Sequence, residues 1–175
     1  MKSLKNFFFI TLILLLSINN LKAENKVAYL DIDFILTNTL AGKLLLGDLK
    51  EEEQKKISKF KVNDEQFRNN EKKILAKKNL VSGEEIKKEM KALQLEFQEY
   101  KKNKNKEIQN LKNKRNTNII NFINLINPII EKYMADNSIY MLIDKKNVFI
   151  ANTDYDITNN LIELIDNQIK TVEIK

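Results

Sequence analysis

Apolar residues follow two different patterns along this chain of 175 residues. After residue 25 and again after residue 128 they form short, dense runs. Between residues 43 and 127 they are sparse and recur about every seven residues among many Lys and Glu side chains. Dense runs are typical of buried strands and turns, and a seven-residue period is typical of a coiled-coil seam. The pattern predicts a long helical insertion in a small base.

The stretch 43–127 predicts an arm of two antiparallel helices. Its first half places Phe60, Phe67 and Ile74 seven residues apart. Residues 79–84 interrupt the period, and Ser82 followed by Glu85 forms the sequence signature of a helix N-terminus. The second half has apolar or aromatic residues in steps of four, three, four and three, at Ile86, Met90, Leu93, Phe97 and Tyr100. We therefore expect a helical hairpin with its tip near 79–84.

Three short apolar segments outside the arm predict strands. They are 26–31, 139–143 and 148–151, and residues 144–147 between the last two predict a hairpin turn. Helical turns should flank them. Asp31 or Asp33 can cap a turn after the first strand, residues 37–39 supply a second cap, and Asp156 or Thr158 can cap a last helix.

The fold class that we expect is α+β, with the base built from residues 24–42 and 128–175. Three short strands cannot close a barrel alone, and each is apolar on both faces, so several copies would complete one small β-barrel-like base. The alternative is a monomer whose strands pack on the root of the arm. The residues expected in the shared base are Val27, Tyr29, Leu142, Ile143, Val148 and Ile150. Pro128 should kink or restart the returning helix, and with Gly42 and Gly47 it is a candidate hinge.

The N-terminus predicts export. Lys2 and Lys5 precede an apolar run over 7–18, and the small residue Ala23 follows shortly afterwards. This layout is typical of a secretory signal with cleavage after residue 23, because the apolar run is short for a membrane span. The alternative is an uncleaved N-terminal anchor.

Charge divides the chain into a basic arm and an acidic base. The formal net charge is +6, but residues 50–116 hold 20 basic against 12 acidic residues, a net of +8. The remainder of the chain after residue 23 has a net charge of −5. A basic surface attracts nucleic acid, anionic lipid or acidic protein, and export argues against nucleic acid.

No group of residues predicts catalysis. The chain has no Cys and no His, which excludes thiol chemistry and imidazole bases. The nearby carboxylate pairs at 31 and 33 and at 154 and 156 fit caps better than an acid–base pair. The three glycines, at 42, 47 and 83, are too far apart for a phosphate-binding loop. We expect no enzymatic activity, cofactor or metal.

Six lysines close to the predicted tip are the candidate contacts for a bound protein. They could attract an acidic partner, or they could simply keep an exposed tip solvated. They are Lys72, Lys73, Lys77, Lys78, Lys87 and Lys88.

Several segments together resemble the Skp (OmpH-like) family of periplasmic chaperones. The N-terminal segments are 26–31 and 41–43, and the C-terminal segments are 139–144, 148–151 and 156–158. They lie in the family's order around a basic helical hairpin, behind a signal. One departure is Ile150, where many relatives have Tyr. No basic cluster here aligns with the family's proposed lipopolysaccharide site.

The resemblance implies a homotrimer with a small β-barrel body and three helical arms around a cavity. It implies an ATP-independent holdase that binds unfolded outer-membrane proteins in the periplasm and prevents their aggregation. Contact with anionic lipid or lipopolysaccharide is a further implied property. The alternative function is an exported coiled-coil module that binds anionic lipid or scaffolds another envelope protein. A nucleic-acid-binding coiled coil would require that the N-terminus is not a signal.

Overall fold

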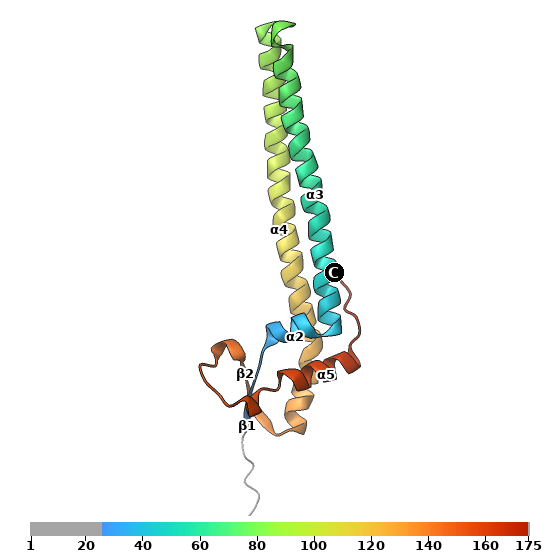
Figure 1. Cartoon of the computed structure of the whole chain (residues 1–175), viewed down its shortest axis with the longest axis vertical. Helices are drawn as coiled ribbons and strands as arrows, with labels where there is room; N and C mark the ends of the chain where they lie inside the picture. The colour runs from blue at the N-terminus through green and yellow to red at the C-terminus, as the bar shows by residue number, and fades with distance from the viewer. Residues whose placement is uncertain (1–25, 175) are drawn as a thin grey trace, which may run out of the picture.

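A long arm of two antiparallel helices rises from a small base (Figure 1). This computed structural model describes residues 26–174. The predicted signal, residues 1–23, lies outside the described residues. Within 26–174, no helix is both long and apolar enough to cross a membrane.

The base is built around a parallel pair of strands that the arm separates in sequence. Strand β1 (Lys26–Leu30) pairs with β2 (Ile139–Asp144). The other edge of β1 meets a later segment, because the backbone N–H of Ile157 donates to the carbonyl of Tyr29 at 3.0 Å. Segments from both ends of the chain thus complete the base, and the arm is an insertion within it.

The chain enters the arm through two capped helices. Asp31 caps α2 (Ile32–Asn38) by accepting the Phe34 N–H at 2.9 Å. Thr39 caps α3 (Leu40–Ala76) by accepting the Gly42 N–H at 3.2 Å, and its side chain is buried. These two bonds confirm the caps predicted at the entry to the arm. The predicted cap of the last helix by Asp156 or Thr158 is wrong, because Ile157 precedes α5 (Thr158–Gln168) and no side chain caps it.

The hydrophobic core lies at the root of the arm. It joins α3, α4 (Gly83–Asp136) and α5 (Thr158–Gln168) through side chains that are at most 1% exposed, such as Leu45, Phe122 and Leu161. Asp166 of α5 also accepts the backbone N–H of Leu40 at 2.7 Å. After α5, residues 169–174 pack against the same core and run back along the root (Figure 1).

The two arm helices meet at a short turn at the tip. A 3-10 turn (Lys77–Asn79) follows α3, and α4 begins at Gly83. Ser82 caps α4 by accepting the Glu85 N–H at 3.2 Å, as the sequence predicted. The core does not extend this far. Beyond Leu49 and Asn118, Phe60 is the only buried residue that the structure describes in the arm.

The prediction of a third strand is wrong for the single chain. Residues 148–151 form no strand, and the predicted hairpin turn is a 3-10 turn (Lys145–Asn147) capped by Asp144. Phe149 and Ile150 are 100% and 85% exposed. The 3-10 turn stands in place of the hairpin turn that would return the chain along the free outer edge of β2, so the sheet has two strands rather than three within the described residues.

Pro128 does not restart the helix. Helix α4 continues through it to Asp136. Pro128 and Asn124, four residues earlier, both lie on the exposed face. The Asn124 carbonyl that loses its hydrogen-bond partner can therefore be solvated. Gly42 lies in a tight contact, because a Cβ there would be 2.0 Å from the Leu36 carbonyl oxygen. Hinge motion at residues 42, 47 and 128 stays a prediction.

Candidate functional site

The outer half of the arm contains a long groove between α3 and α4. We call it the tip groove. It has a volume of about 1280 Å³ and is lined by residues 64–71 of α3 and by residues 83–105 of α4. Seam residues in this lining, such as Phe67, Met90 and Leu93, are partly exposed, so part of the coiled-coil seam is open to solvent.

Apolar side chains from the predicted seam line the tip groove. Phe67 of α3 meets Phe97 and Tyr100 of α4 with ring centroids 5.1 Å apart in each case. Toward the tip the lining continues with partly exposed Ile86, Met90 and Leu93. These residues are the heptad positions of the sequence, so the predicted seam is confirmed, but it does not fully close.

A cluster of polar and aromatic contacts closes the end of the groove that is nearer the base. Lys104 Nζ lies 2.7 Å from Asp64 Oδ2 and about 5.6–5.7 Å from the ring centroids of Phe60 and Tyr100. The Tyr100 hydroxyl donates to the Phe60 carbonyl at 3.1 Å. The hydrogen bond from Lys104 lowers the pKa of Asp64, and burial raises the pKa of Tyr100. Both shifts favour a charged Asp64 and a protonated Tyr100 at neutral pH, which the contacts of this cluster require.

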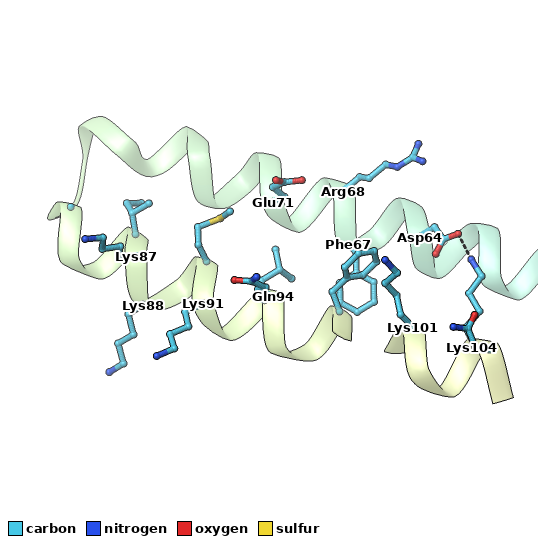
Figure 2. A pocket seen from close by; sticks show the side chains of 16 residues that line it. Asp64, Phe67, Arg68, Glu71, Lys87, Lys88, Lys91, Gln94, Lys101 and Lys104 are labelled. Atoms are coloured by element: carbon cyan, nitrogen blue, oxygen red, sulfur yellow. Dashed lines mark hydrogen bonds and ion pairs between the residues drawn. The ribbon is translucent and has the colours of Figure 1, made fainter. Parts of the chain in front are cut away.

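The lining of the tip groove is predominantly basic. The lining contains six basic side chains and only two carboxylates, those of Asp64 and Glu71. Lys101 points between the helices, with Nζ 5.3 Å from the Phe97 ring centroid, whereas Arg68, Lys88 and Lys91 extend outward (Figure 2). The basic residues are Arg68, Lys87, Lys88, Lys91, Lys101 and Lys104. The groove therefore combines an apolar floor with a positive rim.

The structure divides the six lysines predicted from the sequence. Lys87 and Lys88 line the tip groove. Lys77 instead pairs with Glu89 across the turn, at 2.9 Å. The remaining three, Lys72, Lys73 and Lys78, are exposed outside the groove lining. Closeness to the tip in sequence therefore did not show which of these lysines line the groove.

Sequence reasoning missed the other basic residues of the groove. Lys101 and Lys104 each follow a seam aromatic, Phe97 and Tyr100, by four residues. Residues four apart on a helix lie on the same face. That spacing could have placed both lysines over the seam. Arg68 and Lys91 carried no comparable signal.

Five large apolar side chains of the base are also exposed, and we call this set of residues the base patch. It consists of Val27, Tyr140, Met141, Phe149 and Ile150, which are between 44% and 100% exposed. It adjoins β2, whose outer edge has no partner strand within the described residues. An exposed strand edge beside large apolar side chains favours pairing with another chain.

The residues predicted for a shared base are only partly on this surface. Val27 and Ile150 are exposed and belong to the base patch. Tyr29 is buried within the single chain, and the other three are partly buried. Those three are Leu142, Ile143 and Val148. Tyr140, Met141 and Phe149 were not predicted, because alternation in a strand that is apolar on both faces does not show which face stays open.

Ion pairs hold the loop that presents Phe149. Lys145 Nζ lies 3.0 Å from Asp156, and Lys146 Nζ lies 2.7 Å from Asp33. Burial alone would raise the pKa of Asp156, but hydrogen bonds from Thr158 and Lys145 outweigh it and lower that pKa. The carboxylates at 33 and 156 thus have structural contacts. The described part of the chain contains no group of three or more Asp or Glu side chains arranged to hold a metal ion.

Comparisons with known proteins agree with this architecture. The family described as "Outer membrane protein (OmpH-like)" matches residues 26–165. A crystal structure from Caulobacter crescentus CB15, described as that of a candidate OmpH-like outer membrane chaperone, has the same fold with a TM-score of 0.76. Its sequence is 19% identical, and the match covers 84% of this chain and 87% of that one. Comparison with curated proteins gives no match.

Proposed function

This chain belongs to the OmpH-like family, and we propose that it is an ATP-independent holdase chaperone of the periplasm. In this proposal it binds unfolded outer-membrane proteins between helical arms and prevents their aggregation. The family match and the fold shared with a candidate outer membrane chaperone support this role.

The open, basic seam of the arm is the observation that carries the proposal. Phe67, Met90 and Leu93 remain partly exposed although they occupy seam positions. An unfolded client exposes apolar side chains and unpaired backbone, and it aggregates through both. A surface that offers several weak apolar contacts and a positive rim can hold such a chain without selecting a sequence.

The base patch supports assembly into a homotrimer. Phe149 and Ile150 would be costly to leave exposed, and the free edge of β2 can pair with a strand from another copy. Residues 148–151, which form no strand in the single chain, would then act as a strand of the shared barrel. Several arms on one base raise the effective concentration of weak binding sites around one client.

The proposed location is the periplasm, reached through the predicted signal at residues 1–23. Lipid and lipopolysaccharide contacts belong to the same proposal, because the excess of basic residues on the arm would also attract anionic headgroups.

The function is tested by diluting an unfolded outer-membrane β-barrel protein from denaturant into buffer that contains the purified chain without residues 1–23. We expect light scattering by the client to stay low at one trimer per client and without ATP. A matched control is an unrelated monomeric helical protein of the same net charge. Aggregation equal to that control would contradict the proposal.

The alternative function is an exported envelope module that binds anionic lipid or scaffolds another envelope protein. The exposed lysines outside the tip groove, such as Lys72 and Lys73, are the observation in its favour. This alternative predicts sedimentation with phosphatidylglycerol vesicles and no preference for unfolded over folded protein.

A further inference from the structure

The shape of the tip groove restricts what can occupy it. Its lining on α4 runs from residue 83 to residue 105, which corresponds to about 33 Å of helix. A single extended strand of about ten residues spans the same length.

The charge of the groove restricts the occupant further. Lys87, Lys88 and Lys91 form no ion pair with any described residue of the chain. They flank a floor made of Ile86, Met90 and Leu93. The complementary ligand carries carboxylates beside apolar side chains.

We infer that the tip groove of each arm binds one extended segment of an unfolded client in which apolar residues alternate with Asp or Glu. Alternate side chains of an extended segment point to opposite faces, so one face can lie on the apolar floor. The acidic face then meets the rim. Lys88 and Lys91 extend outward, and their flexible four-carbon stems allow them to reach carboxylates at the mouth (Figure 2).

This inference rests on the proposed holdase function and adds a defined subsite and a sequence preference to it. A membrane surface fits the same groove less well, because lipid headgroups offer no apolar side chains to the floor of Ile86, Met90 and Leu93. Lipid binding would depend on Lys72, Lys73 and Lys78 as much as on the lysines of the groove, since all are exposed.

A tryptophan reporter tests occupancy of the groove directly, because the chain contains no Trp. Leu93→Trp places the reporter in the groove lining, and Val62→Trp places a control on an exposed part of α3 outside it. The probe is a ten-residue peptide that alternates Leu and Glu. We expect a blue shift with Leu93→Trp and none with Val62→Trp.

The specificity of the groove is tested with two variants of equal charge change. K87E/K88E/K91E reverses lysines of the groove, and K72E/K73E/K78E reverses lysines outside it. We expect the first to weaken binding of the Leu/Glu peptide about tenfold or more, and the second about twofold or less. Circular dichroism checks that both remain folded. K87Q/K88Q/K91Q, which removes charge without repulsion, should weaken binding as well.

Three outcomes would overturn the inference. The first is equal loss in both Lys→Glu variants. The second is equal binding of a Leu/Lys peptide. The third is a reporter shift with phosphatidylglycerol vesicles but none with the peptide, which would assign the groove to lipid. Each leaves the holdase function standing if the unmodified chain still suppresses client aggregation, and failure of that suppression alone would contradict the holdase function.

Discussion

The root and the outer half of the arm are built from the same two helices but are held together differently. At the root, Leu45, Phe122 and Ile126 are at most 1% exposed and form a continuous core with the base. In the outer half, Phe67 and Leu93 occupy equivalent seam positions and remain partly exposed. Among the described elements, a third helix, α5, covers the seam only at the root.

Ion pairs between the helices continue along the arm where the core ends. Four lysine–carboxylate pairs join α3 and the tip turn to α4 at 2.6–2.9 Å, and their side chains are 27–47% exposed. The pairs are Glu52–Lys114, Lys56–Glu107, Asp64–Lys104 and Lys77–Glu89. Exposed pairs contribute little to stability. They can fix the register of the helices while leaving apolar surface available to a client.

The largest effect should follow from a cavity at the root. Phe122→Ala removes a fully buried ring, and we expect a loss of about 3–5 kcal/mol in the free energy of unfolding. Leu125→Ala, on the same helix but 44% exposed, should cost much less. Urea denaturation followed by circular dichroism measures both. Similar losses would mean that the root is not the stability core.

The second prediction compares two glycines of α3. Gly42→Ala would place a Cβ 2.0 Å from the Leu36 carbonyl oxygen, and we expect a cost of about 1–3 kcal/mol. Gly47→Ala meets nothing within 4 Å and should stabilise the helix by up to about 1 kcal/mol. Thermal unfolding distinguishes the two. If Gly42→Ala also stabilised the chain, the close packing at the root would be contradicted.

A third substitution tests the weaker seam of the outer arm. Phe67→Ala removes two ring contacts, and we expect a loss of about 1–2 kcal/mol, smaller than at Phe122. Leu95→Ala is the control, because its side chain is 59% exposed. Amide hydrogen exchange should show faster exchange near residues 64–100 and unchanged exchange at the root. Faster exchange at both places would mean that the arm opens as one unit.

The smallest expected effect is a loss of stability of the arm at low pH. The hydrogen bond from Lys56 lowers the pKa of Glu107 from its ordinary value of 4.5, and that from Lys104 lowers the pKa of Asp64 from 3.8. Because these pKa values are lower in the folded arm than in the unfolded chain, the two carboxylates stabilise the arm at a pH above their ordinary pKa values. This contribution is lost as the pH falls through their pKa values in the folded arm. Helical melts at pH 7 and pH 3 should differ, and E107Q should reduce the difference. If E107Q left the difference between the melts at pH 7 and pH 3 unchanged, the Lys56–Glu107 pair would not contribute to the acid sensitivity of the arm.

Local rules predicted the arm well. Phe67, Phe97 and Tyr100 meet in the seam that their spacing predicted, and Ser82 caps the returning helix. Asp31 and Thr39 cap the helices at the entry to the arm. These features depend on residues within a few positions of one another, or on a repeated period, so the sequence carries them directly.

Features that depend on distant partners could not be predicted in the same way. The apolar, β-branched composition of residues 148–151 favours a strand, but the 3-10 turn before them does not return the chain along the free edge of β2. The tip groove depends on how far apart the helices lie, which a seven-residue period does not state. Helix α4 continues past Pro128 because the lost hydrogen bond falls on an exposed face.

The central claim is that several arms on one base hold one unfolded client. Analytical ultracentrifugation of the chain without residues 1–23, mixed with a limiting amount of an unfolded outer-membrane β-barrel protein, tests it most directly. We predict one soluble species that contains three copies of the chain and one client. A chain that sediments as a single copy while the client is lost to the pellet would contradict the account.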